Sequence, residues 1–302
     1  MAKPTALVVG GGGYFGARLS EDLGTTHDVT ITYRSTSPVR EAWMAASGVR
    51  ALPYDSSRDK GFATTDSFDV VVNLAMPGAN EAKANPEQAV ERGLATAGAC
   101  AGLLDEGRAG RLVHFSTFHV YGGEGAPGYA ETTPAAPKHP YGEAHLAVER
   151  FFEDREDVAI LRPSNLVGAP AHGELGDQAG LIFLDLCRQA AQDGAMSLRN
   201  DGLSYRDILS FPDAITAVRA VAGAPDLGHR IFNLAAGEAV TLKEIAEGIA
   251  AQAPGSVPVT FGDGVDSFRA PFNIETARLR ALCWAPRQSF TQEVPRTLSV
   301  FR

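Results

Sequence analysis

Short apolar segments alternate with segments of helical periodicity along the first half of the chain. The apolar segments are rich in β-branched residues and have the length of strands, and they cover residues 5–10, 28–34, 49–55, 68–75, 111–116 and 157–163. The intervening segments, such as PEQAVERGLATAGACAGLLDEG at 86–107, repeat apolar residues with the spacing of an amphipathic helix. This repeated alternation predicts an α/β fold with a doubly wound parallel sheet and helices on both faces.

The alternation becomes less regular after Pro163. We therefore expect a larger domain that carries the parallel sheet and a smaller C-terminal lobe. The sheet domain is predicted to comprise residues 1–165 with 205–235 returning to it, and the lobe residues 166–204 with 236–302. Within the lobe, Thr241 and Glu244 have the spacing of a capping box, which predicts the start of a helix.

Glycines fill the turn between the first strand and the first helix, VVGGGGYFG. Their spacing fits both GxxGxxG and GxGxxG, two fingerprints of dinucleotide-binding Rossmann folds. Glycines at such a turn let a pyrophosphate approach the amides at the helix N-terminus, where the helix dipole favours an anion. A flexible turn without a ligand is the alternative. The cofactor-binding residues expected at this turn are Gly10, Gly13, Tyr14, Phe15 and Gly16.

The end of the second strand bears on which dinucleotide is bound. An acidic residue there would accept hydrogen bonds from the adenosine ribose of NAD. This chain has Tyr33, Arg34 and then hydroxyl residues at 35–37, which is a plausible cradle for the extra phosphate of NADP. NADP is therefore favoured over NAD, although Arg34 could also be an ordinary solvated arginine. Further cofactor contacts are expected at the ends of the third and fourth strands, from Asp55, Leu74 and Ala75.

Charge and cysteine content exclude several classes of protein. The formal net charge of −9 is spread without acidic or basic blocks, which argues against nucleic acid or an anionic membrane as the main partner. The cysteines, Cys100, Cys187 and Cys283, are far apart and indicate neither a disulfide framework nor a metal site. We see no signal peptide and no transmembrane run. These features favour a cytoplasmic protein that acts on a small molecule.

Several motifs in order along the chain resemble those of one family. They are GGGGYFG (10–16), NLA (73–75), STFHVYG (116–122), YGEAH (141–145), RPSNLVGAP (162–170), YRDILSFPDA (205–214) and IFNLAAGEAVTLKEIA (231–246). Together they resemble the extended short-chain dehydrogenase/reductase family, also described as NAD-dependent epimerases/dehydratases. The resemblance spans almost the whole chain. It implies a soluble enzyme with a Rossmann domain and a smaller C-terminal substrate lobe.

The resemblance implies roles for individual residues. Thr117 is similar to the residue whose hydroxyl binds the substrate oxygen, and Tyr141 to the general acid/base that moves a proton while hydride moves to or from the nicotinamide. Asn165 and Arg206 are similar to residues that bind substrate phosphates. Each has an alternative: Thr117 could cap a turn, Asn165 could satisfy loop backbone, and Arg206 could pair with Asp207. The resemblance also implies substrate contacts from Ser116, Phe118 and His119, and a cofactor contact from Pro163.

The chain departs from the family pattern YxxxK at His145, where the family has lysine. A spacing of four keeps residues 141 and 145 on one helix face, so the geometry survives the exchange. The electrostatics change, because a histidine with a reference pKa of ~6.5 is mostly neutral at pH 7. A free tyrosine has a pKa near ~10 and needs a neighbouring cation to lower it. Our hypothesis is that His145 anchors the nicotinamide ribose by hydrogen bonding and activates Tyr141 only partly.

Other interpretations of the exchange remain open. Lys138 could supply the missing charge from the preceding loop, and His119 could act in catalysis. The site could also bind cofactor without turnover, as in a sensor or regulatory protein, because the electrostatic contribution of the lysine is lost.

The resemblance also constrains the reaction. Sugar dehydratases of this family carry Asp-Glu directly after the catalytic Thr, where this chain has Phe118 and His119, so dehydration is disfavoured. A ketoreductase or an epimerase remains, and Arg34 favours reduction with NADPH. The implied substrate is a phosphate-bearing, nucleotide-linked sugar, and the family implies a homodimer as one assembly. Because Phe118 makes the pocket more apolar, a non-sugar carbonyl compound stays an alternative.

Overall fold

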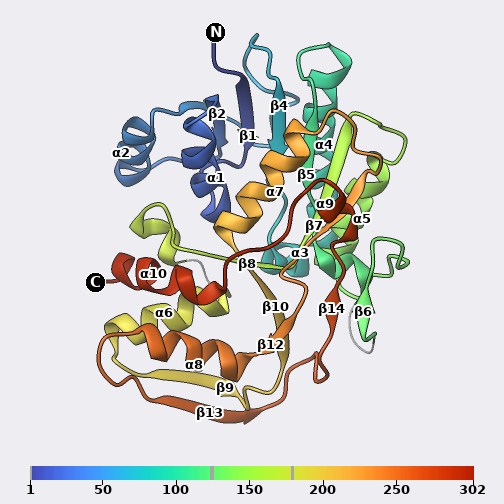
Figure 1. Cartoon of the computed structure of the whole chain (residues 1–302). Coiled ribbons are helices and arrows are strands. Elements are labelled where there is room, and N and C mark those ends of the chain that lie inside the picture. The colour runs from blue at the N-terminus through green and yellow to red at the C-terminus, as the bar shows by residue number, and fades with distance from the viewer. Residues whose placement is uncertain (1, 123–125, 178–179) are drawn as a thin grey trace.

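The computed structural model describes residues 2–122, 126–177 and 180–302. Its central element is a seven-stranded parallel sheet (Figure 1). In sheet order the strands are β11 (Ile231–Leu234), β7 (Val158–Pro163), β5 (Leu112–Phe115), β4 (Val70–Asn73), β1 (Thr5–Val9), β2 (Asp28–Tyr33) and β3 (Arg50–Pro53). The direction of chain progression reverses between β1 and β4. This is the doubly wound order expected from the sequence, so the predicted fold class is confirmed.

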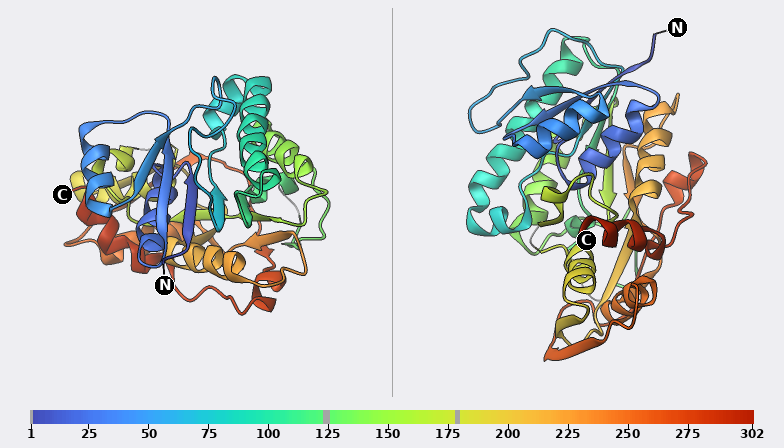
Figure 2. Two further views of the ribbon diagram at one scale, coloured as in Figure 1. Left: turned by 90° about the horizontal axis from the view of Figure 1, so that it is seen from above. Right: turned by 90° about the vertical axis from the view of Figure 1, so that its left-hand side faces the viewer.

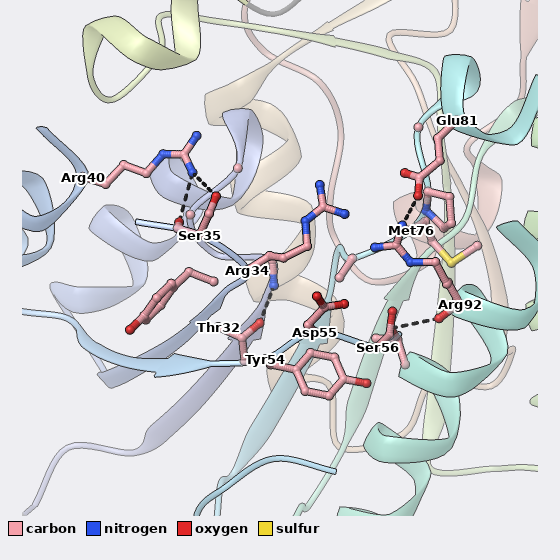
Figure 3. Close-up of a pocket in the computed structure, with 18 of the residues that line it drawn as sticks. Thr32, Arg34, Ser35, Arg40, Tyr54, Asp55, Ser56, Met76, Glu81 and Arg92 are labelled. Atoms are coloured by element: carbon pink, nitrogen blue, oxygen red, sulfur yellow. Dashed lines mark hydrogen bonds and ion pairs between the residues drawn. The ribbon is translucent and has the colours of Figure 1, made fainter. Parts of the chain in front are cut away.

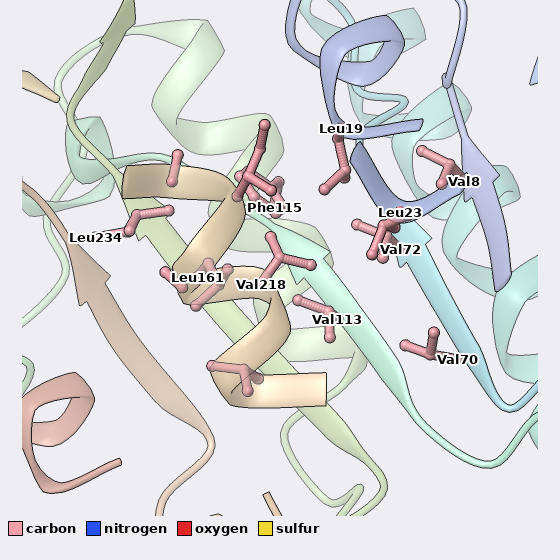
Figure 4. Close-up of a cluster of buried hydrophobic side chains, with 14 of the residues drawn as sticks. Val8, Leu19, Leu23, Val70, Val72, Val113, Phe115, Leu161, Val218 and Leu234 are labelled. Atoms are coloured by element: carbon pink, nitrogen blue, oxygen red, sulfur yellow. The ribbon is translucent and has the colours of Figure 1, made fainter. Parts of the chain in front are cut away.

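Alternate residues of β1 point to opposite faces of the sheet, as the period of two in a strand requires. Ala6 and Val8 belong to one buried apolar cluster, whereas Leu7 and Val9 belong to another. Figure 4 shows part of the first cluster, with Val218 of the covering helix over Val113 and Leu161. Both faces are buried, which explains why the strands are continuous apolar runs without polar alternation.

The helices divide between the two faces of the sheet, as the left view of Figure 2 shows. The first face carries α1 (Tyr14–Gly24), α2 (Pro38–Ser47), α7 (Phe211–Gly223) and α9 (Ala277–Ala281). The second face carries α4 (Pro86–Asp105) and α5 (Pro140–Phe151), and the short α3 (Ala79–Ala84) contacts both of these helices.

The remaining elements lie mainly at one end of the sheet domain, in the lower part of Figure 1. Their strands are β6 (Gly128–Tyr129), β8 (Asn165–Val167), β9 (Met196–Asn200), β10 (Tyr205–Ser210), β12 (Ala239–Thr241), β13 (Val259–Gly264) and β14 (Asn273–Ile274). Their helices are α6 (Ile182–Gln192), α8 (Leu242–Gln252) and α10 (Val294–Val300), with 3₁₀ turns η1 (Phe118–Tyr121), η2 (Gly173–Asp177) and η3 (Phe290–Glu293). Helices α6, α8 and α10 share a separate apolar core.

Local predictions agree with these elements. Each predicted strand is found, shortened by a residue or more, and both bonds of the capping box at Thr241 and Glu244 are present. The C-terminal segment is not restricted to the lobe, because Leu279 and Trp284 pack into the core of the seven-stranded sheet. Within the described ranges, no helix is both long and apolar enough to cross a bilayer.

Candidate functional site

The glycine turn between β1 and α1 needs glycine for steric reasons. Gly10 has a φ of +81°, in the left-handed region that favours glycine. A Cβ on Gly16 would lie 2.4 Å from the carbonyl oxygen of Gly10, and one on Gly11 would lie 2.6 Å from the side chain of Ile31. Gly13 is the N-cap of α1 and has no capping side chain. The turn is therefore closely packed against the sheet, and the start of α1 offers amide groups to an anion.

A cavity of about 480 Å³ opens beside this turn, at the carboxyl ends of β1, β2, β3 and β4 (Figure 3). We call it the glycine-turn cavity. It includes five of the predicted cofactor-binding residues, which are Gly10, Gly13, Arg34, Asp55 and Ala75. Its position beyond the strand ends, where the strand order reverses, is the usual ligand site of such sheets. Its glycine turn, at the start of α1, suits the pyrophosphate of a dinucleotide.

Basic and hydroxyl side chains line one part of the glycine-turn cavity. Arg34 is exposed, and Arg40 donates to the carbonyl and hydroxyl oxygens of Ser35 at 3.1 and 3.2 Å. Glu174 of η2 reaches this group from the lobe, where it accepts from the Ser37 hydroxyl at 2.7 Å and lies 3.4 Å from Nε of Arg40. Arg34 and Arg40 could together hold a phosphate.

Asp55, two residues after β3, also lines the glycine-turn cavity. Its carboxylate accepts from the backbone amide of Ser57 at 3.0 Å and from the Ser57 hydroxyl at 2.8 Å. These hydrogen bonds hold the pKa of Asp55 below its usual value. The group is therefore a carboxylate at neutral pH and can accept hydrogen bonds.

Other predicted cofactor residues lie outside the lining of this cavity. The Tyr14 hydroxyl donates to the carbonyl oxygen of Gly168 at 2.5 Å, and the Phe15 ring packs against Phe115 at 5.4 Å between centroids. Leu74 packs against the apolar core, and Pro163 is buried in β7. Gly16 is buried in α1. In this structure these residues serve packing around the turn and the strand ends.

Tyr141 lies in the first turn of α5, where Thr117 meets it from the end of β5. Burial raises the pKa of the Tyr141 phenol, and the neighbouring Thr117 side chain lowers it by less. The Thr117 hydroxyl also caps η1, accepting from the amide of His119 at 3.3 Å. The structure thus brings together two predicted catalytic hydroxyls, and the capping role considered for Thr117 is present as well.

His145 lies one turn after Tyr141 on the same face of α5, with ring centroids 4.6 Å apart. The side chain is buried, and within the described part of the chain neither ring nitrogen has a hydrogen-bond partner. Burial, with smaller effects of His114 and His119, lowers the pKa of His145 to about 3. It is therefore neutral at pH 7. A buried polar group without a partner is costly, and ribose hydroxyls of a dinucleotide would satisfy it.

A second cavity, of about 430 Å³, is lined in part by Phe118 and His119 of η1. We call it the histidine cavity. It is lined by Phe118, His119, Gly122, Lys138, His139, Asn165, Tyr205, Arg206, Ser267, Phe268 and Phe272. Four of the predicted substrate or catalytic candidates meet there, namely Phe118, His119, Asn165 and Arg206. Lys138, the preceding-loop alternative for the missing charge, lines this cavity as well.

The side chains of Asn165 and Arg206, the two predicted phosphate ligands, already donate hydrogen bonds within the protein. The Asn165 amide donates to the carbonyl oxygen of Asp207 at 2.8 Å. Arg206 donates to the carbonyl oxygen of Tyr205 at 2.8 Å, and its guanidinium lies 5.8 Å from the centroid of the Phe268 ring. The Asp207 carboxylate instead accepts from the hydroxyl of Ser164 and from backbone amides, so it serves to hold the loop after β11.

Ser116 does not line either cavity in the described structure. Its hydroxyl donates to Glu149 of α5, and Glu149 forms a buried ion pair with Arg162, with an Nη2–Oε2 distance of 2.5 Å. The Arg162 guanidinium lies over the Tyr121 ring at 4.8 Å. This network ties β5, β7 and α5 together, and it holds the helix that carries Tyr141.

Sequence reasoning did not select His139, Arg40 or Phe268 as site residues. His139 precedes Pro140 at the first position of α5, which is an N-cap signal that could have identified it. Phe268 has a φ of +62°, which only the folded structure reveals. Arg40 is an ordinary helix residue by sequence, and its place at the cavity depends on how α2 packs.

The comparisons with known proteins agree with this geometry. The sequence model of the NAD dependent epimerase/dehydratase family matches residues 6–235. The chain belongs to this family. Among curated relatives, UDP-glucose 4-epimerase 2 of Oryza sativa subsp. japonica is 27% identical over 293 residues, covering 85% of this chain and 72% of that protein. Other relatives in the family are nucleotide-sugar dehydratases, so family membership does not choose between epimerisation and dehydration.

Solved structures share the fold at low identity. A UDP-glucuronic acid 4-epimerase from Bacillus cereus, in complex with UDP-glucuronic acid and NAD, has a TM-score of 0.78 at 18% identity, over 98% of both chains. RMD from Pseudomonas aeruginosa, complexed with NADPH, has a TM-score of 0.79 at 21% identity, also over 98% of both chains. The family fold thus extends over the lobe as well as the sheet domain.

Proposed function

We propose that the protein is an NAD(P)-dependent oxidoreductase of the extended short-chain dehydrogenase/reductase type, acting at a carbonyl or hydroxyl carbon of a nucleotide-linked sugar. The observation that carries this proposal is that Thr117 adjoins the Tyr141 phenol, while His145 lies beside it with no hydrogen-bond partner among the described residues. The cofactor, when bound, supplies or accepts the hydride. Tyr141 holds and moves the proton at the substrate oxygen, and Thr117 orients that oxygen.

The cofactor is held by the glycine turn and by His145 in this proposal. The close packing at Gly10 and Gly16 lets a pyrophosphate lie against the start of α1. The ring nitrogens of His145 gain ribose hydroxyls as partners. We favour NADP, because Arg34 and Arg40 both line the cavity and no carboxylate ends β2.

Reduction and epimerisation are the reactions that the site residues support. Where a dehydratase of this family has Asp-Glu, the chain has Phe118 and His119. Phe118 lacks an ionisable group, and burial, with His139 and Arg206 nearby, lowers the pKa of His119 to about 4. A neutral histidine at that place is a weak acid catalyst for expelling water. We therefore propose a ketoreductase or an epimerase.

The nucleotide that co-purifies with the protein tests the cofactor proposal. Mass spectrometry of the nucleotide released on denaturation, with NADP and NAD titrations of the protein, is expected to give tighter binding of NADP. Tightly retained NAD would contradict NADP use and favour an epimerase, which regenerates its cofactor in each turnover. The absence of binding by either dinucleotide would contradict the whole proposal.

Turnover of a UDP-sugar tests the catalytic pair. Tyr141→Phe is expected to reduce kcat by a factor of about 10² to 10⁴, the usual contribution of general acid/base catalysis, with little change in dinucleotide affinity. UDP-glucose with added NADP⁺ is the first probe. Chromatography of the sugar detects epimerisation, and the absorbance of newly formed NADPH detects oxidation of a sugar hydroxyl, the reverse of the proposed reduction. A protein of the same fold that only senses the cofactor would bind dinucleotide, turn over no carbonyl substrate, and keep its output in Tyr141→Phe.

One observation favours a second candidate, the reduction of an apolar carbonyl compound. The rings of Phe118 and Phe272 are stacked at 6.2 Å with an interplanar angle of 9°, and Phe268 packs against both. This aromatic wall belongs to the histidine cavity. Turnover of an aromatic ketone with NADPH, and none of any UDP-sugar, would favour this candidate.

A further inference from the structure

Two histidines form a hydrogen-bonded pair in the wall of the histidine cavity. His139 is the N-cap of α5, and its Nδ1 atom accepts a hydrogen bond from the backbone N–H of Gly142 at an N–N distance of 3.2 Å. An imidazole nitrogen that accepts a hydrogen bond carries no proton, so the proton of His139 lies on Nε2. This Nε2 is 3.3 Å from Nδ1 of His119 and is the donor between them. The capped helix end therefore fixes the tautomer of His139.

The tautomer of His119 follows from that of His139. Because its Nδ1 accepts from His139, the proton of a neutral His119 lies on Nε2. The ring is neutral at pH 7, since burial lowers its pKa to about 4. No described residue accepts a hydrogen bond from this Nε2: the side-chain hydrogen bond of His119 is the one to His139. The ring lines the histidine cavity, where a bound molecule could accept a hydrogen bond from this Nε2–H group.

We propose that His139 is a positioning residue that holds His119 as the Nε2–H tautomer, and that His119 donates this N–H to an oxygen of the substrate beside Tyr141. The ring centroids of His119 and Tyr141 are 5.9 Å apart. At this separation His119 reaches an oxygen near the reacting carbon, while Tyr141 and Thr117 hold the reacting oxygen. This inference rests on the proposed function, and it calls for a substrate with a second oxygen close to the reacting carbon, as in a sugar ring.

The tautomer also limits the chemistry of His119. A nitrogen that already carries a proton cannot take one from a carbon, and Nδ1 is occupied by the hydrogen bond from His139. His119 is therefore a neutral hydrogen-bond donor and not the base of an elimination. The hydrogen-bond geometry, in addition to the residue types, thus favours hydride transfer without loss of water.

Histidine tautomers can be observed by long-range ¹H–¹⁵N NMR of the full chain labelled with ¹⁵N-histidine. We expect His119 to give the Nε2–H pattern at pH 7 without any ligand. In His139→Ser the serine still caps α5 but no longer donates to His119, so His119 should become a mixture of tautomers. His119→Gln assigns the signal. A His119 that is the Nδ1–H tautomer or charged in the wild type, or that is unchanged in His139→Ser, would overturn the inference.

Turnover of UDP-glucose separates the donor role from a structural one. Gln at 119 can accept from His139 through its Oε1 atom and donate through Nε2, whereas Leu can do neither. We expect kcat/KM of His119→Leu to fall by about 10²-fold or more, the usual loss for one such donor, and His119→Gln to retain about 10-fold more activity than His119→Leu. Equal losses in both variants would contradict the donor role. If wild-type protein turned over no UDP-glucose, the sugar assignment would fail while the NMR experiment still judged the tautomer.

Discussion

At the scale of single residues, His145 decides how closely this site follows its family. It has the place of the family's lysine but not its charge, because burial lowers its pKa to about 3. Burial also raises the pKa of Tyr141. The imidazole can hydrogen-bond a ribose, but it cannot stabilise a tyrosinate as a permanent cation does. Its distance from Tyr141 follows from the helix, and its neutrality follows from the packing around it.

His145→Lys is expected to make turnover faster and to extend the activity of the enzyme to lower pH. A cation beside Tyr141 favours the phenolate, so the rising limb of the kcat/KM profile should move down by about one pH unit or more, with about 10-fold higher activity at pH 7. The pH profile of turnover is the measurement. His229→Lys, which makes the same exchange at an exposed loop position, is the control. An unchanged profile in His145→Lys would show that residue 145 does not set the acidity of Tyr141.

At the scale of elements, the turn from β1 into α1 needs glycine where the backbone of another residue approaches too closely for a side chain. Gly16 lies inside α1, where alanine would be the better helix former. Its missing side chain leaves space for the carbonyl oxygen of Gly10. Gly24 ends the same helix and faces open space. The two glycines therefore have different reasons to be present, although they look alike in the sequence.

Gly16→Ala is expected to destabilise the fold by about 1–3 kcal/mol, the usual cost of forcing extra atoms into a packed site. The displaced turn should also weaken dinucleotide binding by about 10-fold or more. Gly24→Ala, on the same helix, should change stability by no more than about 1 kcal/mol and leave binding unaltered. Urea denaturation and dinucleotide titration of both variants are the measurements. Equal effects in the two variants would contradict this account of the turn.

At the scale of the whole molecule, the fold buries several histidines in neutral form. The pKa of His114 and of His145 is lowered to about 3, and that of His119 to about 4, in each case mainly by burial. In the unfolded chain these groups have the ordinary value of 6.5 and take up protons first as the pH falls. The free energy of unfolding therefore falls with pH below about 6.5. Burial raises the pKa of Asp207, so this group has the opposite effect and makes the free energy of unfolding rise as the pH falls.

His145→Gln is expected to reduce the acid sensitivity of folding. Each neutral buried histidine contributes a slope of about 1.4 kcal/mol per pH unit below the unfolded pKa, and the variant lacks one such contribution. Urea denaturation between pH 6.5 and pH 4.5 measures the slope, and subtraction from wild type removes the effect of Asp207. The exposed His229→Gln serves as the control. Identical slopes in wild type and His145→Gln would contradict burial of a neutral imidazole.

The sequence by itself determined what depends on near neighbours in the chain. Strand length and helical spacing predicted the parallel sheet, glycine spacing predicted the turn at Gly10, and Thr241 with Glu244 predicted a capped helix. The spacing of Tyr141 and His145 also placed them on one helix face. These features follow from backbone geometry over a few residues, so a linear pattern contains them.

Only the tertiary structure decided what depends on segments that are far apart in sequence. It paired His139 with His119, brought Glu174 of the lobe to Arg40, and packed Trp284 into the sheet core. It also gave His145 its burial, which lowers its pKa from 6.5 to about 3 and so keeps the imidazole neutral well below pH 6.5. Desolvation and hydrogen bonding act through space and not along the sequence. The hydrogen-bond partners, the burial and the pKa of a side chain therefore depend on how the whole chain packs.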